Sequence, residues 1–156
     1  MIANSLSKYF PKVQLEQGKM RAGLDIGLRS SEHRDSFWFQ TKGDESFMSG
    51  HVYHDRDNAP THYGWRRDLD FAVVDRDGAN DLKAAVRDSQ LVISNADATL
   101  RIDLGDCADQ NLTDGVRLVT VESDVKGDKT RTRVGVGEYA NTLTTYEVRN
   151  GTLVQL

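Results

Sequence analysis

Aspartates gather between residues 55 and 81, and their spacing is typical of side chains that bind hard cations. The stretch contains Asp55, Asp57, Asp68, Asp70, Asp75, Asp77 and Asp81. Ca²⁺ takes about six to eight oxygen ligands, commonly from carboxylates two residues apart around a loop that a glycine turns sharply. The run at 75–81 has part of this pattern, which makes Asp75, Asp77 and Asp81 candidate calcium ligands.

The run at 75–81 departs from an EF-hand loop at both ends. With Gly78 at the glycine position of that loop, Val73 replaces the first ligand and Ala84 replaces the closing glutamate. Aspartate and glycine also favour such a run for backbone reasons, because the Asp side chain accepts hydrogen bonds from nearby amides and glycine tolerates positive φ. The sequence therefore favours a turn here, with a calcium site as the alternative.

Three of the four histidines lie close together in sequence, at His51, His54 and His62. Neutral imidazole is a common zinc ligand. A regular strand over 47–54 would point His51 and His54 to opposite faces, so a shared site requires a bulge or a turn in that segment. The set most compatible with a bound metal is His54, His62 and Asp55.

His62 beside Asp55 or Asp57 also has the composition of an acid–base pair, because a carboxylate can orient an imidazole and hold its tautomer. The sequence contains no Gly-x-Ser-x-Gly motif and no phosphate-binding loop. Cys107 is the only cysteine, and the acidic run at 105–109 around it raises the pKa of a thiol. We assign no catalytic residue, and the sequence favours a protein that is not an enzyme.

Aromatic residues concentrate in the first half of the chain, where they could serve as core or as binding platforms. The run His-Tyr-Gly-Trp-Arg-Arg at 62–67 is expected to be partly exposed, because a glycine separates the rings and two arginines follow them. Tyr63, Trp65 and Arg66 are therefore the candidate ligand-binding residues.

The composition is that of an ordinary soluble domain, with 38% hydrophobic and 28% charged residues in a chain of 156. This length allows one core, so we expect a single domain over 1–156. The net charge of −4 and the scattered basic residues argue against binding to nucleic acid or to an anionic membrane. No apolar run is long enough to span a bilayer. We expect cytoplasmic residence. Export is the alternative, because a single cysteine fits either compartment.

The chain changes character near Pro11. Apolar residues recur at helical spacing before that proline, at Ile2, Leu6, Tyr9 and Phe10, which predicts a short helix or a free arm over 1–11. From residue 12 onward, short alternating segments are separated by Gly, Asn and Asp, which is typical of strands and turns. A β domain is therefore expected over 12–156.

Turns recur about every 8–12 residues in this part, so the predicted fold is mostly β, either a β-sandwich or an antiparallel meander barrel. About nine to eleven strands are expected. They fall within 24–28, 36–54, 63–75, 91–93, 100–104, 116–121, 131–139 and 144–156. Leu100, Ile102 and Leu104 alternate with polar residues, which indicates a sheet with one wet face. The segment 81–88 is predicted as a short helix, with a strand as the alternative.

Asn150-Gly151 predicts a tight hairpin near the end of the sequence. A two-residue loop would place Tyr146 opposite Gln155, whereas a G1 bulge would place it opposite Val154. The second register is predicted, because it groups more apolar residues on one face. The last strand is expected to be tied to the sheet, and the alternative is a homo-oligomer that pairs through it.

These features favour a noncatalytic binding or interaction module whose loops near 50–81 contact a small ligand, a carbohydrate or a partner protein. The alternative is a metal-dependent protein or enzyme, with calcium or zinc held by His54, His62 and Asp55 or by residues 75–81. A structural subunit of an assembly is the third interpretation.

Overall fold

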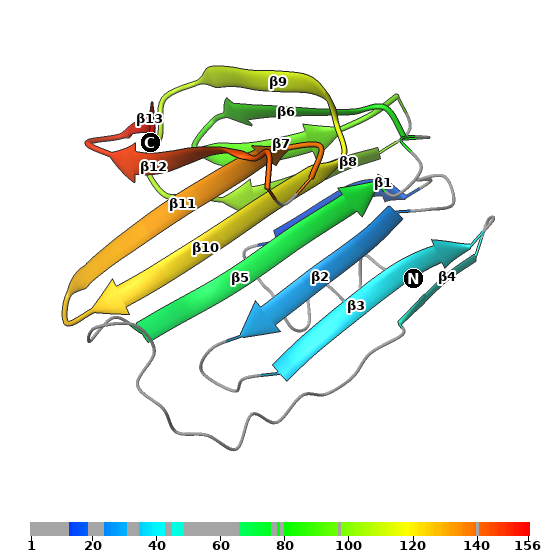
Figure 1. Cartoon of the computed structure of the whole chain (residues 1–156), viewed down its shortest axis with the longest axis horizontal. Helices are drawn as coiled ribbons and strands as arrows, with labels where there is room; N and C mark the ends of the chain where they lie inside the picture. The colour runs from blue at the N-terminus through cyan, green and yellow to red at the C-terminus, as the bar shows by residue number, and fades with distance from the viewer. Residues whose placement is uncertain are drawn as a thin grey trace.

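The computed structural model describes a protein made of two β-sheets (Figure 1). The described backbone covers residues 13–18, 24–30, 35–42, 45–48, 66–75, 78, 80–96, 98–139 and 141–156, and the described side chains begin at residue 71 and leave out 125 and 126. The helix or arm predicted over 1–11 lies outside these ranges. All regular elements of the described residues are strands.

Five strands form the first sheet, in the order β1-β8-β7-β6-β9. They are β1 (Val13–Gly18), β8 (Ala98–Asp103), β7 (Gln90–Ser94), β6 (Leu82–Arg87) and β9 (Gln110–Val116). Eight strands form the second sheet, in the order β13-β12-β11-β10-β5-β2-β3-β4. They are β13 (Thr152–Gln155), β12 (Thr144–Arg149), β11 (Lys129–Gly137), β10 (Leu118–Lys126), β5 (Arg66–Asp75), β2 (Leu24–Ser30), β3 (Asp35–Lys42) and β4 (Glu45–Met48). All paired strands are antiparallel.

The two sheets pack against each other, which confirms the predicted β-sandwich, and they do not close into a barrel. The chain passes between the sheets three times, from β1 to β2, from β5 to β6 and from β9 to β10. The last passage takes only one residue, Arg117. Between the passages the chain forms meanders, over β6 to β8 and over β10 to β13.

The core lies between the sheets and is built from alternate residues of the strands. In the five-stranded sheet the fully buried residues are Leu82, Val86, Leu91, Ile93, Leu100 and Ile102. In the eight-stranded sheet they face the buried residues Phe71, Val73, Val119, Val121, Val134 and Val136. The alternation predicted for 100–104 is confirmed, because Leu100, Ile102 and Leu104 are buried while Asp103 is exposed.

Residues 82–87 form the strand β6, so the predicted helix at 81–88 is wrong. Leu82, Ala84 and Val86 are at most 3% exposed, and Ala85 lies on the opposite face of the strand. A helix would place Ala85 on the same side as Leu82, and a run this short fits both the helical and the strand period. Pairing with β7 on one side and β9 on the other decides the conformation, as tertiary context overrides a weak local preference.

The register predicted for the last hairpin is also wrong. Tyr146 lies opposite Gln155, and Val148 lies opposite Leu153, so the loop contains only Asn150 and Gly151. Both loop residues have positive φ, 50° and 75°, which is the type I′ pattern that matches the twist of the two strands. The inward residue is Leu153, which is 6% exposed, whereas Val154 is 37% exposed. The predicted register had placed Val154 rather than its neighbour Leu153 on the inward face.

This register predicts that truncating two neighbouring side chains has very different effects on the free energy of unfolding. Leu153→Ala should lower the free energy of unfolding by about 2 kcal/mol or more, because it leaves a cavity beside the core. Val154→Ala, the matched control, should change it by only about 0.5 kcal/mol, because that side chain faces solvent. Urea unfolding of both variants measures the difference, and a larger loss for Val154→Ala would contradict the register.

Candidate functional site

Most of the predicted site residues lie outside the described part of the chain. They are His54, Asp55, His62, Tyr63, Trp65 and Asp77. Arg66 begins β5 and pairs with Val125 of β10, but its side chain is outside the described set. The histidine metal site and the aromatic binding segment therefore stay predictions.

Asp75 organises the turn that follows β5. The side chain is buried at 1% exposure, and its two carboxylate oxygens accept hydrogen bonds from Asn80, one from the backbone N–H at 3.0 Å and one from Nδ2 at 3.2 Å. Its carbonyl accepts a bond from the Gly78 N–H at 3.3 Å. Asp81 is exposed and has a positive φ of 49°. The described geometry is that of a turn held by an aspartate, which is the alternative that the sequence favours.

Arg117 joins this turn to the ends of two strands. Its carbonyl accepts a hydrogen bond from the Asp75 N–H at 2.8 Å, and its own N–H donates to the Gly137 carbonyl at 3.0 Å. Its guanidinium lies against Gly78, where a Cβ atom would come within 2.9 Å of a guanidinium nitrogen. Glycine at position 78 therefore accommodates both the positive φ of 65° and the close approach of the Arg117 guanidinium.

Among the described residues, no group of three or more His, Cys, Asp or Glu side chains is placed to hold a metal ion. Within the same residues, no helix is long and apolar enough to cross a membrane.

Cys107 is buried, and this burial raises the pKa of its thiol, so the thiol is protonated and a poor nucleophile at neutral pH. The sequence analysis ascribed this direction to the acidic neighbours instead.

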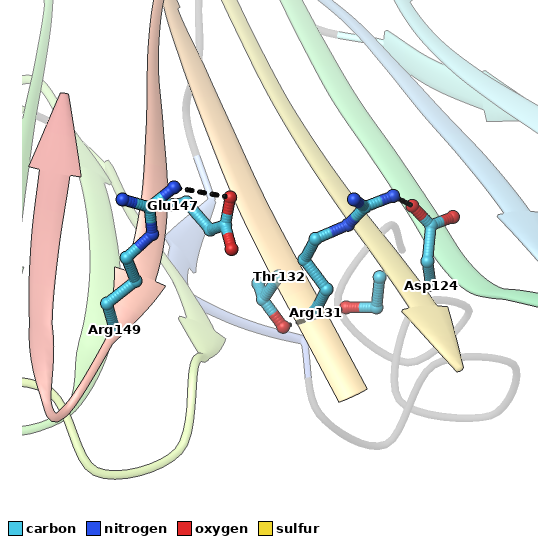
Figure 2. Close-up of polar contacts among 6 residues, drawn as sticks. Asp124, Arg131, Thr132, Glu147 and Arg149 are labelled. Atoms are coloured by element: carbon cyan, nitrogen blue, oxygen red, sulfur yellow. Dashed lines mark hydrogen bonds and ion pairs between the residues drawn. The ribbon is translucent and has the colours of Figure 1, made fainter. Parts of the chain in front are cut away.

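Two arginines, one on β11 and one on β12, form ion pairs with acidic residues of the eight-stranded sheet (Figure 2). The Arg131 guanidinium donates to Asp124 across the strands at 2.9 Å, and Arg149 donates to Glu147 of the same strand at 3.4 Å. Arg133 lies in register with Glu147 on one side and with an acidic residue of β10 on the other. These residues form a mixed polar surface rather than a basic patch.

Strand β9 is irregular, and two hollows adjoin it. The pairing between β9 and β6 skips Leu112 and Gly115, so each is the extra residue of a β-bulge. Bulges bend a strand and interrupt its contact with the neighbouring strand. The facing residues of β6 include the small Ala84 and Ala85, which leave room beside the bulges. Figure 1 shows β9 along the edge of the sheet next to β6.

The first hollow has a volume of about 520 Å³ and involves β6, β7 and β9. Its lining residues are Lys83, Ala84, Ala85, Arg87, Val92, Ser94, Asn111, Leu112, Thr113 and Asp114. Arg87 is held in place, because its guanidinium donates to the Val86 carbonyl at 2.7 Å and to Oδ1 of Asn111. Lys83 lies in register with Asp114. The hollow therefore presents ammonium, guanidinium, amide, hydroxyl and carboxylate groups around a small apolar floor.

The second hollow has a volume of about 450 Å³ and lies at the seam between β9 and the strands β11 and β12. Its lining residues are Leu112, Thr113, Val136, Gly137, Glu138, Tyr139, Thr142, Thr144 and Tyr146. Tyr139 is 56% exposed, whereas Tyr146 is half-buried against the core. This hollow offers aromatic rings and hydroxyl groups, and it shares Leu112 and Thr113 with the first.

The loop that carries Tyr139 folds tightly onto the end of β11. The Thr142 N–H donates to the Tyr139 carbonyl at 3.0 Å, and the Tyr139 N–H donates to Oγ1 of Thr142 at 3.1 Å. A Cβ atom at Gly137 would lie 3.0 Å from the Thr142 carbonyl oxygen, and one at Gly135 would lie 3.0 Å from Cδ1 of Leu143. The two glycines of this strand thus let Thr142 and Leu143 lie close to β11.

Neither hollow is predicted by the sequence patterns. The sequence patterns predicted no element and no role for residues 110–115, where the apolar alternation is weak. The signal that could have located β9 is Asp114-Gly115, because a glycine inside a strand pattern often marks a bulge.

Comparison with known proteins finds no relative for this chain, since no family model, no curated protein and no solved structure matches it.

The hydrogen bonds of Asp75 predict that this residue stabilises the fold. Asp75→Ala should lower the free energy of unfolding by about 1–3 kcal/mol, because both donors of Asn80 lose their buried acceptor. The matched control is Asp106→Ala, at an exposed aspartate, for which a change within about 0.5 kcal/mol is expected.

Urea unfolding after EDTA treatment measures the free energy of unfolding of both variants. Thermal unfolding of the parent protein with and without Ca²⁺ then distinguishes a simple turn from a calcium site. A turn alone predicts that Ca²⁺ leaves the melting temperature of the parent protein unchanged. A saturable rise in the parent that Asp75→Ala abolishes would contradict this and identify Asp75 as a ligand.

Proposed function

We propose that this protein is a noncatalytic binding module that holds an elongated ligand rich in hydroxyl groups, with carbohydrate as the chemical class, along β9. The observation that carries the proposal is the pair of hollows that share Leu112 and Thr113. Each volume lies within the range of about 300–1,000 Å³ that is usual for ligand sites.

The two hollows offer two different kinds of contact, and a sugar chain uses both kinds. The first hollow supplies hydrogen-bond donors and acceptors, including Lys83, Asn111 and Asp114, which suit hydroxyl groups. The second supplies the rings of Tyr139 and Tyr146, which suit the apolar faces of sugar rings. An extended ligand that crosses β9 would use both kinds of contact at once.

The held geometry of the lining residues supports the same proposal. The Arg87 side chain is held by its bonds to Val86 and Asn111, and the backbone at Tyr139 is held by its bonds to Thr142. Groups that are already ordered lose little conformational entropy when a ligand binds. The loops near 50–81, with Tyr63, Trp65 and Arg66, are a further proposed contact region for this ligand or for a partner protein.

Binding to carbohydrate is tested by calorimetric titration with neutral oligosaccharides, using di- and hexasaccharides of glucose, xylose and mannose. We expect binding by at least one series, with affinity that rises with chain length because only the longer sugars reach both hollows. Tyr139→Ala should weaken binding about fivefold or more, since a ring at a binding site contributes roughly 1 kcal/mol or more.

Two control variants give this experiment its specificity. Tyr139→Phe keeps the ring and should bind nearly as the parent does, and Asp128→Ala, in the turn at the far end of β11, should bind as the parent does. Binding that disappears after EDTA treatment would favour the metal-dependent alternative at His54, His62 and Asp55. No binding by any of the sugars, or equal losses in Tyr139→Ala and Asp128→Ala, would overturn the proposal.

A further inference from the structure

Asn150 is the only asparagine of the chain that precedes a glycine. It is exposed, and together with Gly151 it forms the two-residue loop of the β12–β13 hairpin. Gly151 has no Cβ atom, so no side chain hinders the approach of its backbone nitrogen to the side chain of Asn150. Asparagine side chains are chemically labile, because the backbone nitrogen of the following residue can attack their amide carbon.

The other described asparagines are better protected. The Asn80 side chain is buried and donates to Asp75, Oδ1 of Asn95 accepts a bond from the Ala98 N–H at 2.8 Å, and Oδ1 of Asn111 accepts from Arg87. Asn141 is exposed like Asn150, but it precedes Thr142, whose β-branched side chain crowds the attacking nitrogen. Among the described asparagines, only Asn150 therefore combines exposure with an unhindered nucleophile.

We propose that Asn150 is a site of spontaneous covalent modification, which converts it to aspartate and isoaspartate. The Gly151 nitrogen, after losing its proton to solvent, forms a bond to Cγ of Asn150. The bond from Cγ to the side-chain nitrogen breaks, and ammonia leaves. Water then opens the resulting cyclic imide at either carbonyl, which yields an aspartyl or an isoaspartyl link. The overall reaction consumes one water and releases one ammonia, with no change in oxidation state.

The two products differ in their effect on the hairpin. Aspartate adds a negative charge but keeps the backbone, and it tolerates the positive φ of 50° at this position. Isoaspartate inserts one extra carbon atom into the backbone of a loop that has only two residues. The pairing of Arg149 with Thr152 and of Val148 with Leu153 depends on that loop length, so isoaspartate releases β13 from β12.

The modification is measured by incubating the folded, full-length protein at mildly alkaline pH and mapping its peptides by mass spectrometry over time. The peptide that contains Asn150 should gain about 1 Da, several-fold faster than the peptides that contain Asn95, Asn111 or Asn141. Electron-transfer fragmentation should show isoaspartate as part of the product. Equal rates at Asn150 and Asn141 would overturn the proposal.

Two variants separate the chemistry from its structural effect. Asn150→Gly keeps a loop compatible with type I′ geometry and removes the reacting amide, so the mass gain in this peptide should disappear. Asn150→Asp carries the charge without the extra atom, so exchange of the Leu156 N–H, which donates to the Thr145 carbonyl at 2.8 Å, should stay slow. The same amide should exchange faster in the purified isoaspartate form. Slow exchange in that form would overturn the proposed release of β13.

Discussion

The hydrogen bond from the Asp75 N–H to the Arg117 carbonyl holds together two of the three places where the chain passes between its sheets. Asp75 ends β5 just before one passage, and Arg117 is itself the other. Since Arg117 also donates to Gly137, the ends of β5, β9 and β11 meet at one point. The positions of β9 and of the Tyr139 loop, and therefore of both hollows, depend on this junction.

Strand β9 is an irregular edge strand of the five-stranded sheet, and the proposed binding surface lies along it. A regular edge strand offers unpaired backbone groups to other chains, and bulges are one of the devices that discourage such pairing. Bulges interrupt β9 at Leu112 and Gly115, and Leu112 lines both hollows. The proposed binding surface thus lies beside irregular strand pairing rather than on a long loop.

Local patterns were sufficient for the fold class but not for the details of pairing. Alternation at 100–104 and the glycine and asparagine turns correctly indicated antiparallel sheets, because these signals lie within a few residues. The strand at 82–87 and the inward position of Leu153 depend on partners elsewhere in the sandwich, so the local pattern misassigned both. The hollows could not be predicted, since they arise where β6, β7, β9, β11 and β12 meet.

The long hairpin of β10 and β11 has a consequence for how the chain acquires its fold. The two strands pair without a break from Leu118–Gly137 to Lys126–Lys129, across a loop of only two residues. Closing so short a loop requires little loss of chain entropy. Pairing of β10 with β5 must instead bring Leu118 to Val74 across the strands β6 to β9, which lie between them in the chain. We therefore expect this hairpin to form early and to offer its free edge to β5, so that the eight-stranded sheet grows outward from it.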